Sequence, residues 1–141
     1  MNATTAEIAA DKINLMQDHL RTVGGKYLVL FDNSVVRCNE LCELFNDASE
    51  RTTMSDDDIG FFDQLKKLRE VSIAARMKLE TDIEIVAGSE YDNATNENRH
   101  TVVARAIELI ETFASNTLVP FNTQIEKGIA RIQAIAMARL C

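Results

Sequence analysis

The sequence predicts an all-α protein, a single-domain antiparallel helical bundle of four to five helices. Between Tyr27 and Phe45, apolar residues recur at alternating steps of three and four, which aligns them along one face of a helix packed against other helices. The members of this stripe are Leu28, Phe31, Val35, Cys38, Cys42 and Phe45. One proline and five glycines provide too few turns for a sandwich or barrel of many short strands. With 141 residues, 46% of them hydrophobic, we expect residues 1–141 to share one core.

The first helix is expected to begin near Thr5. Thr4 and Glu7 have the spacing of a capping box, in which each side chain binds a free backbone amide of the first turn. The buried side of this helix would carry Ile8, Ile13, Met16, Leu20 and Val23. Gly24 and Gly25 are predicted to end it, because glycine adopts the left-handed conformation of a helix C-terminus at little cost.

A second helix is predicted from Tyr27 to Phe45, since the apolar stripe is too long for a strand. This helix is apolar on more than one side, so it is either central in the bundle or covered by another molecule. We predict a partner-binding surface here, formed by the apolar residues outside the stripe and by two acids beside them. These residues are Val29, Leu30, Val36, Leu41, Leu44, Glu40 and Glu43.

The polar residues 46–55 are predicted to form a loop, and a third helix is expected from Asp56 to Val86, ending before Gly88. Ser55 is a suitable N-cap, and the three aspartates that follow it lie where the helix dipole is positive. A calcium site is not favoured, because the glycine and the distal glutamate of a calcium loop are not at their spacing.

The middle of the third helix is basic, with five cations against the single acid Glu70. These cations are Lys66, Lys67, Arg69, Arg76 and Lys78. We expect them to pair with acids of the second helix and of the loop after it, namely Glu40, Glu43, Asp47 and Glu50. Left unpaired, the cations would instead form a patch for phosphate or for an acidic partner.

The polar residues 88–98 are predicted to form a mobile loop before the last helical region. A fourth helix is expected from Asn98, with Val103, Ala106, Ile110, Phe113 and Thr117 on its apolar side. Pro120 lacks an amide hydrogen and biases Val119 away from the helical conformation. The apolar pattern nevertheless continues to the C-terminus. The last helix is therefore either kinked near Pro120, which gives four helices, or broken there, which gives five.

No grouping of residues typical of an enzyme is present. His19 lies late in the first helix, where the dipole alone favours an imidazolium. Glu97 and His100 have the spacing found in di-iron helices, but the motif occurs once rather than twice. Cys38 and Cys42 could bind a soft metal or form a redox pair, yet buried cysteines in an aliphatic stripe usually act as small hydrophobes. We therefore predict no enzymatic activity, no metal and no cofactor.

The charge of the chain also limits its partners. Fifteen basic and 22 acidic residues give a net charge of −7, which disfavours nucleic acid and anionic membranes. No apolar run approaches the roughly 18 to 20 residues of a membrane span, and the N-terminus has no secretory signal. The three cysteines, the last of them Cys141, form no disulfide framework. These features predict a soluble, cytoplasmic protein with reduced thiols.

The function predicted from the sequence is a non-enzymatic protein–protein interaction module of the inhibitor, adaptor or chaperone type. It would bind a protein partner through an apolar, acid-rimmed helical surface, and the sequence does not identify that partner. One alternative is a bundle that holds a metal or small ligand through Cys38, Cys42, Glu97 or His100. Another is a structural subunit of a larger assembly, in which copies of the chain form a homo-oligomer.

Overall fold

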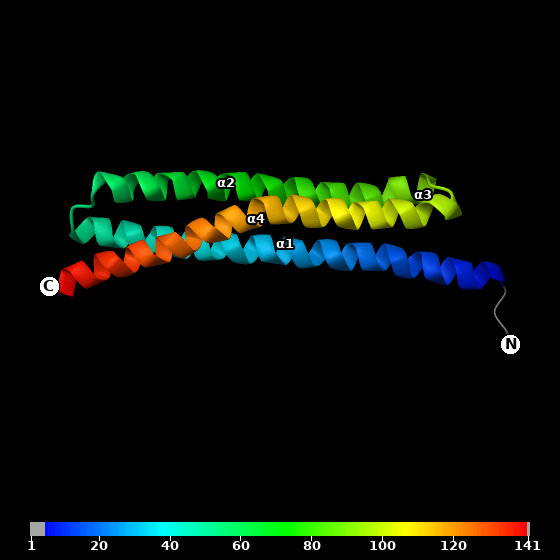
Figure 1. Cartoon of the computed structure of the whole chain (residues 1–141), viewed down its shortest axis with the longest axis horizontal. Helices are drawn as coiled ribbons and strands as arrows, with labels where there is room; N and C mark the ends of the chain where they lie inside the picture. The colour runs from blue at the N-terminus through cyan, green and yellow to red at the C-terminus, as the bar shows by residue number, and fades with distance from the viewer. Residues whose placement is uncertain (1–4, 141) are drawn as a thin grey trace. The chain divides into compact units, whose positions relative to one another are not determined.

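The computed structural model describes the backbone of residues 5–140 and the side chains of residues 15–95 and 97–138. The prediction of an all-α protein is confirmed, since no strand occurs between residues 5 and 140. Three long helices follow one another along the chain (Figure 1), namely α1 (Thr5–Arg51), α2 (Asp56–Ile85) and α4 (Asn96–Leu140). The π-helix η1 (Val86–Glu90) and the single turn α3 (Tyr91–Asn93) extend α2. For this part of the chain, the prediction of four to five helices is wrong.

The helices form two compact units. Unit 1 combines α1 up to Val29 with Arg76–Ala114, and unit 2 combines Leu30–Ala75 with α4 from Ser115 onward. Each long helix therefore contributes a segment to each unit. Within a unit, segments that follow one another in the chain run in opposite directions (Figure 1).

In unit 1, α1 is continuous through Gly24 and Gly25, so the predicted helix end is wrong. Neither glycine has a positive φ, and neither therefore acts as a left-handed cap. A Cβ atom placed on Gly24 would lie 2.4 Å from Cδ1 of Ile83, whereas one placed on Gly25 would have no such neighbour within 4 Å. Gly24 is thus needed because α1 and α2 approach each other closely, not because the chain turns.

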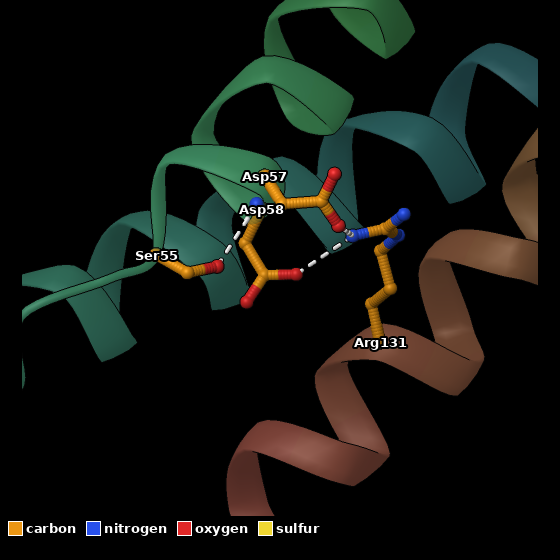
Figure 2. Close-up of polar contacts among 4 residues, drawn as sticks. All are labelled: Ser55, Asp57, Asp58 and Arg131. Carbon is orange, nitrogen blue, oxygen red and sulfur yellow. Dashed lines mark hydrogen bonds and ion pairs between the residues drawn. The ribbon is translucent and has the colours of Figure 1, made fainter.

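The connection between α1 and α2 is shorter than predicted. α1 continues to Arg51, and only residues 52–55 lie between the two helices. Ser55 Oγ accepts a hydrogen bond of 3.1 Å from the backbone N–H of Asp58 (Figure 2), which confirms the predicted N-cap of α2. The capping box predicted for α1 involves Thr4, which lies outside the described residues.

The core of unit 2 is built on the predicted stripe of α1. Of the six members of this stripe, Phe31, Cys38, Cys42 and Phe45 are buried in unit 2, whereas Val35 and Leu28 are only partly buried. The ring of Phe45 stacks on that of Phe62, with 4.2 Å between ring centroids and 15° between ring planes. Burial of a phenylalanine side chain contributes about 1.5–3 kcal/mol. Packing of the phenylalanines on this face therefore holds α1 in place within unit 2.

Two of the three acids at the start of α2 pair within unit 2 with Arg131 of α4. Its Nη1 atom lies 2.9 Å from Oδ2 of Asp57 and 2.9 Å from Oδ1 of Asp58 (Figure 2). The guanidinium also lies over the ring of Phe61, 4.3 Å from the centroid. The hydrogen bonds that Arg131 donates to the two aspartates raise its pKa. The aspartates therefore act in the packing of α4 against α2.

The cations of α2 pair mainly with acids on α2 itself. The N–O distances are 3.4 Å for Arg69 with Glu70, 2.6 Å for Arg76 with Glu80 and 3.1 Å for Lys78 with Asp82. None of the acids predicted as partners forms an ion pair among the described residues. These acids are Glu40, Glu43, Asp47 and Glu50. The prediction of pairing with these acids is wrong, because acids on the same helix are already within reach.

The helical backbone continues past Gly88, so the predicted loop over residues 88–98 is wrong. The buried residues Leu79, Ile83, Ala87 and Tyr91 are spaced by four. In a regular α-helix each step of four turns about 40° too far to stay on one face. The wider turn of η1 reduces this drift and keeps Tyr91 in the core. Only residues 94 and 95 are left to connect α3 with α4.

α4 runs unbroken through Pro120, so the alternative with two helices here is wrong. Proline has no backbone N–H, so the carbonyl of Asn116 loses the hydrogen bond that it would otherwise accept from residue 120. Both residues are exposed, so water can bind this carbonyl. At the other end, Thr95 Oγ1 accepts a hydrogen bond of 3.3 Å from the backbone N–H of Asn98 and caps α4.

Candidate functional site

An apolar groove lies in unit 1 between the end of α2 and the first half of α4. Its volume is about 460 Å³. We call it the α2–α4 groove. It is lined by Lys78, Leu79, Asp82, Ile85, Val86, Glu90, Ala106, Leu109, Ile110 and Phe113.

The groove combines a concave shape with exposed apolar side chains. Leu79 and Ile110 form its buried floor. Ile85 of α2 and Leu109 of α4 remain 44% and 59% exposed. Single exposed apolar residues are common on protein surfaces, but apolar residues gathered in a hollow are typical of binding sites.

The π-helix η1 helps to shape this groove. Val86 and Glu90, the first and last residues of η1, both line it. Between them, the backbone carbonyl of Ala87 accepts a hydrogen bond from the side-chain amide of Gln17 on α1. This bond satisfies a carbonyl in the widened turn. Single π turns inside α-helices occur frequently at functional sites.

The rim of the groove is charged and mostly acidic. Lys78 Nζ lies 3.1 Å from Oδ2 of Asp82 and 5.1 Å from the ring centroid of Phe113. Its charge therefore already interacts with a carboxylate and with an aromatic ring of this chain. Glu90 lies at the other end of the same wall. A second hollow shares Ile85 with the groove and is lined by Met77, Glu80, Thr81, Glu84, Ile85 and Ser89. Acidic side chains therefore lie along the exposed side of α2 next to the groove.

Comparison with known proteins gives no match, so the candidate site is argued from the residues of this chain. No family model, curated protein or solved structure matches this chain. Among the described residues, no three histidine, cysteine, aspartate or glutamate side chains come together as metal ligands would. Between residues 5 and 140, no helix has the length and apolar character needed to span a membrane.

The surface predicted on α1 is only partly available. Val29, Leu30, Val36 and Leu44 are 40–56% exposed, and the acids Glu40 and Glu43 are exposed beside them. The prediction that Leu41 belongs to this surface is wrong. Leu41 is only 6% exposed and lies in the core of unit 2, where its Cδ1 atom would be 3.3 Å from a Cβ atom placed on Gly128. Of the exposed four, Leu44 lines a smaller hollow of about 260 Å³ with Ile132 and Ile135.

The two histidines of the sequence line one further hollow in unit 1. His19 of α1 and His100 of α4 face it together with Leu15, Met16, Val103, Ala104 and Ile107. Both imidazoles are exposed, and neither has a hydrogen-bond partner among the described residues.

The thiols of Cys38 and Cys42 are free and buried in unit 2. Burial raises the pKa of Cys38 to about 12, and the neighbouring Cys42 adds to the shift. A thiol with so high a pKa is a poor nucleophile and metal ligand at neutral pH. Cys38 therefore behaves as a small core side chain, and Cys42 is buried in the same core. Cys141 lies outside the described residues.

The sequence did contain a signal for the groove. Ile85 precedes Val86, the predicted end of the third helix, and Leu109 precedes the predicted apolar position Ile110, just as Val29 and Leu30 follow Leu28. The sequence predicts the surface on the second helix because the surplus of apolar residues is larger there. The pairing of the two groove walls depends on the tertiary fold, which the local pattern does not specify.

Proposed function

We propose that this chain is a non-enzymatic protein-binding module that holds a helical segment of a partner protein in the α2–α4 groove. The single observation that carries the proposal is the exposure of Ile85 and Leu109 within a hollow whose floor is apolar. An amphipathic helix that fills such a groove buries these side chains on both partners.

The groove supports this proposal better than the outer side of α1 does. On α1, Val36 stands between charged or polar neighbours such as Arg37 and Glu40, as on an ordinary solvated helix. In the groove, apolar residues from two helices converge. Burial of a leucine contributes about 1.5–3 kcal/mol, so completing the burial of a half-exposed Leu109 would add about 1 kcal/mol to binding.

Photo-crosslinking in the native host tests this proposal. A photoreactive amino acid replaces Leu109 in the groove, Val36 on α1 or Val119 on α4, all of which are more than half exposed. We expect a covalent adduct from position 109 and none from 119. No adduct from 109, or an adduct from position 36 alone, would contradict the assignment to the groove.

Two alternatives predicted from the sequence remain distinct from this proposal. A module that holds a metal or small ligand would retain that ligand after purification, which elemental analysis and native mass spectrometry detect. A structural subunit would form larger species as its concentration rises, which light scattering detects. The crosslinked product separates the last case, because its mass would equal two copies of this chain.

A further inference from the structure

The charge around the α2–α4 groove specifies the class of partner, and this inference rests on the function proposed above. Five charged side chains line the groove and the hollow that shares Ile85 with it. They are Lys78, Glu80, Asp82, Glu84 and Glu90. Four carboxylates against one ammonium give these lining side chains a net charge of −3, or −2 when Arg76, which pairs with Glu80, is included. A segment that docks here meets an acidic rim.

Some of these acids are already paired and others are not. Glu80 pairs with Arg76, and Asp82 pairs with Lys78, in each case four residues apart on α2. Both pairs have the cation on the N-terminal side, which is the weaker order on a helix. Glu84 and Glu90 are exposed and form no ion pair among the described residues. These two carboxylates are therefore available to a cation from outside the chain.

The dimensions of the groove set the length of the partner segment. The α2 and η1 wall extends from Lys78 to Glu90. At about 1.5 Å per residue this wall is roughly 18 Å long. A partner helix of about three turns would lie along it, with its apolar residues at steps of three and four against Ile85 and Leu109.

We propose that the groove binds a basic amphipathic helix of a partner protein, with an apolar face of about three turns flanked by lysine or arginine. The apolar face covers the floor of the groove, and the flanking cations reach Glu84 and Glu90. The net charge of −7 on the whole chain attracts such a segment at a distance and repels an acidic one.

Two synthetic peptides of about four turns test this charge preference. They share the same leucine and phenylalanine face, and the remaining positions are lysine in one peptide and glutamate in the other. Fluorescence anisotropy measures the binding of each labelled peptide to the full chain. We expect the lysine peptide to bind at least tenfold more tightly, and its affinity to fall when salt rises from about 0.05 to 0.5 M, where the Debye length shortens to a few ångströms.

Matched variants locate the charges that matter. Glu84→Gln with Glu90→Gln removes two acids from the groove, and Glu40→Gln with Glu43→Gln removes two exposed acids from α1. Each double variant loses two of the 22 acids, so the net charge changes equally from −7 to −5. We expect the groove variant to weaken binding of the lysine peptide about tenfold and the α1 variant to change it less than twofold.

The outcomes separate this inference from the proposed function. Equal binding of the two peptides, equal loss in the two double variants or no binding of the lysine peptide would overturn the charge preference. The adduct from position 109 would still stand as support for the groove in each of these cases. Self-association that the change Leu109→Glu abolishes would identify a second copy of this chain as the occupant and would also overturn the inference.

Discussion

Replacing Gly24 by alanine should destabilise the protein, whereas the same change at Gly25 should stabilise it. Alanine is favoured over glycine inside a helix by about 0.5–1 kcal/mol. At Gly25 the new Cβ has no neighbour within 4 Å, so the full gain is expected. At Gly24 the Cβ would lie 2.4 Å from Cδ1 and 2.9 Å from Cγ1 of the buried Ile83.

The magnitude at Gly24 follows from these two contacts. Both distances are too short for carbon atoms, and overpacking of this kind typically costs about 1–3 kcal/mol. After subtraction of the helix gain, we expect Gly24→Ala to lower the free energy of unfolding by about 0.5–2 kcal/mol. For a chain of 141 residues, 1 kcal/mol corresponds to a change in Tm of about 3 °C.

Urea unfolding followed by far-UV circular dichroism measures this contrast. A third variant adds Ile83→Val to Gly24→Ala and removes the Cδ1 atom that lies closest to the new Cβ. This addition should restore part of the loss, which a double-mutant cycle would report as coupling. If α1 ended at this glycine pair in a left-handed cap, Gly25→Ala would instead destabilise by about 1 kcal/mol. That result would refute the continuous helix.

The remaining predictions concern unit 2. Ser55→Ala should lower the free energy of unfolding by about 1 kcal/mol in urea titrations, because the cap on the N–H of Asp58 is lost. Arg131→Ala should cost about 1 kcal/mol, and Arg131→Lys should cost less, because lysine keeps the charge opposite Asp57 but loses the planar guanidinium that lies over the ring of Phe61. For Cys38 the folded pKa of about 12 lies above its usual value of 9.0, so the folded state keeps its proton longer than the unfolded state. Stability should therefore fall as pH rises from about 9 towards 12, and Cys38→Ala should flatten this fall in urea titrations at each pH.

Features set by neighbouring residues could be predicted from the sequence. The cap at Ser55 needs only the amides of the next turn, and the buried face of α1 needs only the three-four spacing from Phe31 to Phe45. Both predictions are confirmed. The all-α fold class follows from the same local periodicity.

Features that depend on distant residues could not be predicted in this way. A glycine pair is compatible with a helix end or with close packing, and only the position of Ile83 decides between them at Gly24. Likewise, the polar residues after Gly88 have a composition that is typical of a loop. Their helical conformation depends on the burial of Tyr91, and that burial needs the widened turn η1.

The candidate groove does not coincide with the surface that the sequence predicts. Local charge and surplus apolar residues indicated an apolar, acid-rimmed helical surface. The sequence alone placed it on α1, where Leu41 is in fact part of the core. The groove joins Ile85 and Leu109 from two different helices, and which helices pair is a property of the tertiary fold.

The most direct measurement is hydrogen exchange of the full chain with and without the lysine peptide, read by mass spectrometry. Binding in the α2–α4 groove predicts slower exchange in residues 78–90 and 105–113, and unchanged exchange in residues 29–44 of α1. Slower exchange confined to residues 29–44, with residues 78–90 and 105–113 unaffected, would place the binding surface on α1 and contradict the assignment of the groove.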